Sequence, residues 1–351
     1  MTYIFKKILL LKLILILCLF SIGQKNHKLH FESSISYGRI LPHNQYLRKI
    51  ILNNSVSLES TLYFNSNGSK THHAPFLYPS YGWSFNFTKS GNKDQIGNIL
   101  STYGSLTLPL QKKKNPLSFK IGLGLGWVEK VYDVNSNYQN LAVGSHLNAN
   151  AQIKIEKTHV LNKKQNLKYA ILLNHLSNGD LKNPNLGFNI CQFQTSYSFG
   201  LKPQKIDTSL RHYTKTKKHS FSIFNFSGLK EFKITSERLN YINETSFQFE
   251  KNYGLKSYLI TGLDFLYNST LEYEKKIEFG LIIGHVLNIG KLRLGALIGS
   301  HIYNKSDNYR RIYNKIMIQY QLTNHLSIRA NLRSHIFNAD FMSLGVGYTI
   351  N

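Results

Sequence analysis

Apolar and polar residues alternate along much of this chain, which is the pattern of a β-strand with one apolar face. The alternation is clearest over residues 117–127, where leucine, phenylalanine, isoleucine and tryptophan are interleaved with serine, lysine and glycine. Such strands suit the wall of a membrane β-barrel, which is apolar toward lipid and polar toward its interior. The side chains expected to face lipid include Leu117, Phe119, Leu123, Leu147, Ile153, Ile171, Phe193 and Phe199.

The alternating segments together predict an all-β protein, an antiparallel transmembrane β-barrel fold with about 16 strands. Eight segments fall within residues 24–201, and eight strands are enough to close a barrel. Residues 202–217 are polar and basic without periodicity, which predicts a linker, and residues 218–351 carry the remaining strands. Two arrangements fit this pattern: one large barrel, or an eight-stranded barrel followed by a second β unit.

The beginning of the chain has the features of a secretory signal peptide. Lys6 and Lys7 precede an apolar run at residues 8–20, and small residues suited to cleavage follow before residue 24. We therefore expect residues 1–23 to direct export, and the barrel to lie in a bacterial outer membrane. With the mature N-terminus inside, the loops near residues 42–52, 90–96, 132–144 and 178–187 would face outward.

The charge of the chain limits its expected partners. Lysine and arginine number 43 against 18 acidic residues, a net charge of +25. A basic protein invites a nucleic-acid interpretation, but an exported barrel meets anionic lipid headgroups, so we expect a membrane partner and no nucleic acid. The 14 histidines form no metal-binding spacing such as H-x-x-x-H, and no phosphate-binding loop occurs. No metal or cofactor is expected.

Residues 167–201 read as one β-hairpin with a candidate site near its turn. His175 and Ser177 are two residues apart on the first arm, so both belong to its apolar face. Asn189 belongs to the apolar face of the returning arm, close to the same turn. An imidazole, a hydroxyl and an amide therefore converge at the rim of an apolar surface. Polar residues also occur at strand ends without any catalytic role, and that interpretation stays open.

The run HLSNGDLKNPNLGFN at residues 175–189 resembles the active-site hairpin of the PagL-type lipid A 3-O-deacylases. These are outer-membrane β-barrel esterases with a lipid-facing His-Ser-Glu triad. The family pattern H-x-S-N followed by N-x-G-x-E matches except at its last position, where this chain has Asn189. The stretches GRILPH at 38–43, GLGLGWVEKVYD at 122–133 and GSHLNA at 144–149 resemble the branch of the family named acyloxyacyl hydrolase.

The resemblance implies a carboxylic ester hydrolase whose substrate is lipid A of lipopolysaccharide. Ser177 would attack the acyl ester, His175 would take its proton, and Asn189 would orient the imidazole. Asn178 and Gly179 would supply the oxyanion hole.

The departure at residue 189 keeps other functions open. An amide lacks the charge of the family glutamate, and a comparable change in a serine protease lowers kcat by about 10⁴. Asp180 is a substitute acid, or else a turn residue. The alternatives are a non-catalytic porin-like or structural outer-membrane barrel, and another lipid esterase such as a phospholipase.

Two short parallels suggest an internal repeat. NHLSNGD at 174–180 parallels SHIFNAD at 334–340, and GSHL at 144–147 parallels GSHI at 299–302. Phe337 stands where the first copy has its serine, so no matching site is expected in the second half. Duplication and coincidence both remain open.

Overall fold

The computed structural model describes residues 29–200, 219–231, 239–254, 256–269, 276–304, 311–336 and 338–350. The expected signal peptide at 1–23 and the expected linker at 202–217 lie outside the described residues. Within the described ranges, no helix is long and apolar enough to cross a membrane.

The first barrel consists of eight antiparallel strands, each paired with the next, and β8 closes the ring by pairing with β1. Its strands are β1 (Leu29–Ile40), β2 (Ser55–Asn65), β3 (Ser80–Lys89), β4 (Asn98–Pro109), β5 (Leu117–Val128), β6 (Leu147–Val160), β7 (Gln165–Ser177) and β8 (Phe188–Gly200). The connection from β1 to β2 contains the short helix α2 (Gln45–Ile50), capped by the side chain of Asn44.

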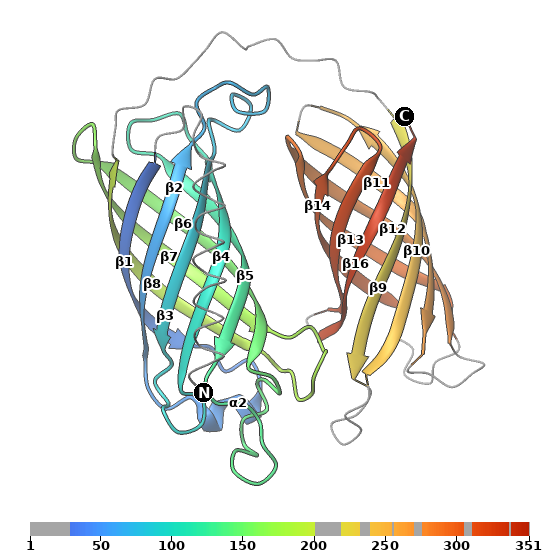
Figure 1. Ribbon diagram of the computed structural model, residues 1–351, viewed down its shortest axis with the longest axis horizontal. Coiled ribbons are helices and arrows are strands. Elements are labelled where there is room, and N and C mark those ends of the chain that lie inside the picture. The colour runs from blue at the N-terminus through green and yellow to red at the C-terminus, as the bar shows by residue number, and fades with distance from the viewer. Residues whose placement is uncertain are drawn as a thin grey trace, which may run out of the picture.

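The second barrel also has eight antiparallel strands and closes between β16 and β9. Its strands are β9 (His219–Glu231), β10 (Leu239–Asn252), β11 (Ser257–Asn268), β12 (Ile277–Ile289), β13 (Leu292–Tyr303), β14 (Ile312–Gln321), β15 (Leu326–His335) and β16 (Asn338–Ile350). The predicted antiparallel barrel fold is confirmed, and of the two arrangements the single large barrel is wrong (Figure 1).

The outer walls of both barrels are apolar, as the alternation predicts. Ile171 is 65% exposed and Phe193 is 53% exposed, whereas Lys120 and Lys154 point inward and are buried. This distribution is the reverse of that in a soluble protein, and it is favourable only when lipid surrounds the wall. The faces follow from the two-residue period, since a shift of one residue would exchange every lipid-facing side chain for an interior one.

The interior of the first barrel is filled by a network of charged and polar side chains. The Glu59 carboxylate lies 3.2 Å from Lys154 Nζ and 3.7 Å from Lys120 Nζ. It also accepts a hydrogen bond from the Tyr103 hydroxyl, and Gln152 donates to that hydroxyl at 2.8 Å. A ring of eight strands is just wide enough for side chains to fill. The paired charges therefore pack the interior rather than line an open channel.

We call the end of the first barrel at which β7 passes into β8 the hairpin end. The connections at residues 41–54, 90–97, 129–146 and 178–187 all lie at this end, and Figure 1 shows α2 among them. Buried apolar residues lie beneath these loops and form one cluster: Ile40, Leu47, Ile50, Ile51, Ile96, Ile99, Val128, Ala142, Val143, Leu176, Phe188 and Ile190. The cluster ties the ends of β7 and β8 to the surrounding loops.

The two barrels contact each other at both ends. Near the hairpin end, the backbone N–H of Asn183 donates to the Glu231 carboxylate at 2.5 Å. Near the opposite end, Phe76 packs in one apolar cluster with Ile289, and Lys256 Nζ lies 5.2 Å from the centre of the Phe76 ring. The loop that follows Ser177 is thus held by the second barrel as well as by the first.

Candidate functional site

The register of β6, β7 and β8 places the candidate residues side by side. His175 is paired with Asn189 of β8 on one side and with Ala151 of β6 on the other. Ser177 is paired with Ala149 of β6. His175, Ser177 and Asn189 therefore lie on the outward face at the hairpin end, where the sequence analysis expects them. The two alanines leave little bulk beside the imidazole and the hydroxyl.

His175 is oriented by Asn189. Its Nδ1 lies 2.7 Å from the side-chain oxygen of Asn189. An amide oxygen can only accept, so the hydrogen is on Nδ1, and Nε2 of the neutral ring carries a lone pair. The half-buried imidazole thus presents to its surroundings the nitrogen that a general base uses.

Ser177 is buried and held by the loop that follows it. Its Oγ donates to the Asn185 side-chain oxygen at 3.2 Å and accepts from the Gly179 N–H at 3.2 Å. Among the described residues, Ser177 makes no hydrogen bond to His175. To reach the imidazole the hydroxyl has to leave Asn185, the asparagine of the N-x-G pattern, for which the sequence predicted no role.

The two expected oxyanion donors already have partners. The Asn178 N–H donates to the Asn185 side-chain oxygen at 3.0 Å, and the Gly179 N–H donates to Ser177 Oγ. The Asn178 side-chain amide donates to Ser145 Oγ at 2.9 Å and to the Lys182 carbonyl at 2.7 Å. Both N–H groups lie next to the hydroxyl, but a substrate oxygen would have to replace their present acceptors.

Gly187 lets the loop pass close over the imidazole. Its backbone has a φ of +75°, and a Cβ at this position would lie 3.0 Å from His175 Cε1. Glycine adopts a positive φ without steric cost. The glycine of the N-x-G pattern is therefore explained by backbone conformation and by the space that His175 needs.

His43 is a site residue that was not predicted from the sequence. It follows β1, whose continuation is joined to β8 by the Leu41 N–H donating to the Asn189 carbonyl at 2.7 Å. His43 Nδ1 lies 3.1 Å from the Asn189 side-chain nitrogen, and His43 Nε2 lies 3.0 Å from the Leu186 carbonyl oxygen. The sequence signal was present only as the last residue of the quoted GRILPH stretch.

Asp180 points to the second barrel rather than to His175. Its carboxylate lies 3.2 Å from Lys230 Nζ, and its carbonyl accepts from the Glu231 N–H at 3.3 Å. Burial raises the pKa of the Asp180 carboxyl, and this effect outweighs the positive charge of Lys230, which lowers the pKa. Two roles were considered for Asp180, a substitute acid and a turn residue. Its φ of +69° agrees with the turn.

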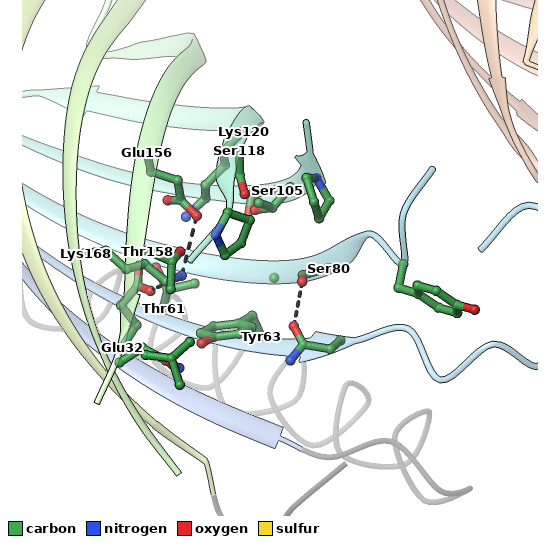
Figure 2. A pocket seen from close by; sticks show the side chains of 18 of the residues that line it. Glu32, Thr61, Tyr63, Ser80, Ser105, Ser118, Lys120, Glu156, Thr158 and Lys168 are labelled. Atoms are coloured by element: carbon green, nitrogen blue, oxygen red, sulfur yellow. Dashed lines mark hydrogen bonds and ion pairs between the residues drawn. The ribbon is translucent and has the colours of Figure 1, made fainter. Parts of the chain in front are cut away.

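A polar cavity of about 410 Å³ lies in the first barrel at the end opposite the hairpin. Figure 2 shows Lys168 within it, between Glu32 and Glu156. Lys168 Nζ lies 2.7 Å from the Glu32 carboxylate and 3.5 Å from the Glu156 carboxylate. Lys168 and His175 are seven positions apart in β7, which separates them by about 20 Å. This cavity is therefore distinct from the candidate site, which is on the outer face of the wall. Across the described ranges, no group of three or more histidine, cysteine or acidic side chains could hold a metal ion.

The parallel between residues 174–180 and 334–340 falls at equivalent places in the two barrels. His175 is near the end of β7, and His335 ends β15, the seventh strand of its own barrel. His335 Nδ1 lies 3.1 Å from the Ile312 carbonyl, and its Nε2 lies 3.5 Å from the Asp340 carboxylate. The second parallel does not correspond, because Gly299 lies within β13 while Gly144 precedes β6. Phe337 lies outside the described residues, and the duplication stays a prediction.

Two closed antiparallel barrels with apolar outer walls and a hydroxyl–imidazole–amide cluster at one rim define a membrane-type β-barrel protein. Residues 27–198 match the family of lipid A 3-O-deacylases (PagL), and residues 219–351 match the C-terminal domain of acyloxyacyl hydrolase. The chain belongs to this family, as the resemblance predicted.

Among solved structures, the chain is similar to a mutant porin of Rhodopseudomonas blastica, with 8% identity and a TM-score of 0.19, covering 92% of this chain and 100% of the porin. It is also similar to the Acinetobacter baumannii outer membrane protein Omp33, with 9% identity and a TM-score of 0.17, covering 92% of this chain and 98% of that protein. No curated protein matched the chain. The fold rests on the strand pairing of the chain itself.

Proposed function

We propose that this chain is an outer-membrane lipid A deacylase that hydrolyses an ester-linked fatty acyl chain with Ser177 as nucleophile and His175 as general base. The observation that carries the proposal is the 2.7 Å contact between His175 Nδ1 and the Asn189 oxygen. That contact leaves the lone pair of Nε2 on the same outward face as Ser177. Membership of the lipid A 3-O-deacylase family supports the choice of substrate.

The reaction would follow the usual course of a serine esterase. Ser177 Oγ turns from Asn185 toward His175, attacks the acyl carbonyl and gives its proton to His175 Nε2. The Asn178 and Gly179 N–H groups stabilise the oxyanion once they have left their present acceptors. Collapse of the tetrahedral intermediate expels the sugar alkoxide, which takes the proton from His175. Water then cleaves the acyl-enzyme by the same steps, releasing a fatty acid.

The position of the site on the outer wall suits a lipid substrate. An acyl chain in the membrane can lie along the apolar wall beside β6 and β7, where Leu147 and Ile153 are exposed. Arg39 of β1 is also exposed on the outward face and is paired with Cys191, two residues along β8 from Asn189. A guanidinium there suits the phosphate groups of lipid A. The network of side chains around Glu59, which crosses the interior of the first barrel, counts against the porin-like alternative.

The test is mass spectrometry of lipid A from cells that express the wild-type chain, Ser177→Ala, or Ser33→Ala. Ser33 is an exposed outward serine on β1 and serves as the matched control. Wild type and Ser33→Ala should both remove one acyl chain, and Ser177→Ala should remove none while still assembling in the membrane. Lipid A of unchanged mass in all three would favour a non-catalytic barrel. Fatty acid release from phospholipid alone would favour the phospholipase.

A further inference from the structure

The side chain of Asn189 can lie in two orientations with opposite consequences. Its oxygen and nitrogen have nearly the same shape, but the oxygen only accepts a hydrogen bond and the nitrogen only donates. With the oxygen toward His175, the proton is held on Nδ1 and Nε2 can accept a proton from Ser177. With the nitrogen toward His175, Nδ1 would have to accept, the proton would move to Nε2, and the base would be blocked. A glutamate has no such ambiguity, because both its oxygens accept.

His43 decides between these orientations. Its Nε2 donates to the Leu186 carbonyl at 3.0 Å, so its Nδ1 carries the lone pair. That lone pair accepts from the Asn189 side-chain nitrogen at 3.1 Å. Nδ1 also lies 3.4 Å from the Leu41 carbonyl, but an unprotonated nitrogen cannot donate to a carbonyl, so Asn189 is its hydrogen-bond partner. The donors thus point one way through the series, from His175 to Asn189, from Asn189 to His43, and from His43 to a backbone carbonyl.

We infer that His43 is a positioning residue that fixes the Asn189 amide and thereby holds His175 in the tautomer that can accept the Ser177 proton. This inference rests on the proposed function, since it assigns a role in that same site. It accounts for an amide where the family pattern has a glutamate. The chain keeps one hydrogen-bond acceptor against His175 by satisfying the extra donor of the amide with a second histidine.

The last acceptor of this series, the Leu186 carbonyl, lies in the loop at residues 178–187 that follows Ser177. Leu186 immediately precedes Gly187, the residue that passes over the His175 ring. His43 is exposed, so without it the Asn189 N–H would donate to water. Water can donate as well as accept, so the amide would no longer have one preferred orientation. The expected consequence is a fall in the fraction of molecules with a competent base, without a change in lipid binding.

The test compares His43→Phe in the wild-type chain and in the Asn189→Glu background, with lipid A in mixed micelles as substrate. In the wild-type background, kcat should fall about tenfold, the worth of one net hydrogen bond, with KM unchanged. In the Asn189→Glu background the same substitution should change kcat by less than about twofold, because a carboxylate has no donor to satisfy. His159→Phe is the control, since His159 is exposed near the opposite end of the barrel.

An equal fall in both backgrounds would mean that His43 only supports the loop, and would overturn the inference, as would an unchanged kcat in the wild-type background. The ring ¹⁵N shifts of labelled histidine provide a second readout. They should report His175 protonated on Nδ1 in the wild type and a mixture of tautomers in His43→Phe; identical shifts would also overturn the inference. If the wild type releases no fatty acid, the proposed function fails, and the ¹⁵N shifts still decide the role of His43.

Discussion

The backbone N–H of Asn183, in the loop of the candidate site, donates to the carboxylate of Glu231 in the second barrel at 2.5 Å. The Asn183 side chain also donates to the Glu231 carbonyl at 3.2 Å, and Lys230 pairs with Asp180. The loop that carries the expected oxyanion donors is therefore held from outside its own barrel. This contact gives the second barrel a physical link to the site, although it has no matching site of its own among the described residues.

Glu231→Ala should loosen the loop and lower the rate of deacylation. Glu231 is buried, and the substitution removes a charge-assisted hydrogen bond worth about 2 kcal/mol. We expect kcat to fall severalfold while both barrels still fold, as judged by the heat-modifiable shift on gels. Asp94→Asn, in another loop at the hairpin end, is exposed and should behave as wild type. Full activity in Glu231→Ala would show that the loop does not need the Glu231 carboxylate.

Substitutions at Asn189 should separate orientation from charge. Asn189→Ala removes the partner of His175 Nδ1 and should lower kcat about tenfold, less than the complete loss expected in Ser177→Ala. Asn189→Glu should preserve or raise kcat, since a carboxylate stabilises the imidazolium formed during the reaction. Single-turnover release of fatty acid from lipid A measures both effects. A complete loss in Asn189→Glu would contradict the assigned orienting role.

Arg39→Gln should weaken binding of the phosphorylated headgroup without affecting chemistry. One cation near an anionic membrane surface contributes about 1 kcal/mol, so KM for lipid A should rise about fivefold with kcat unchanged. The same variant should bind dephosphorylated lipid A as the wild type does. Lys163→Gln, an exposed lysine at the opposite end, is the control. A fall in kcat, rather than a rise in KM, would contradict a role of Arg39 in headgroup binding alone.

Gly187→Ala should displace His175. The new Cβ would lie 3.0 Å from His175 Cε1 on a backbone with a φ of +75°, which an alanine adopts at a cost of about 1 kcal/mol. A small misplacement of a catalytic group lowers the rate steeply, so kcat should fall about tenfold or more. Gly254→Ala is the matched control, because a Cβ there meets nothing within 4 Å. Equal activities of the two variants would mean that the loop shifts without disturbing the imidazole.

The sequence alone determined the strands, their faces and the candidate hairpin. The two-residue period is a relation between neighbours, so it assigns Ile171 outward and Lys154 inward without knowledge of the fold. The same parity brings His175 and Ser177 to one face, and the turn signals place Asn189 opposite. These inferences needed only residues within one hairpin, which is why they could be made from local pattern.

The tertiary structure alone decided how many barrels form and what surrounds the site. Closure depends on β8 pairing with β1, as in His30 opposite Gly200, rather than continuing into β9. The contacts of Asn189 with His43 and of Asn183 with Glu231 join residues 146 and 48 positions apart. No periodicity links such residues, because their proximity is set by the closing register of the barrel and by the docking of one barrel on the other, which depend on the whole chain.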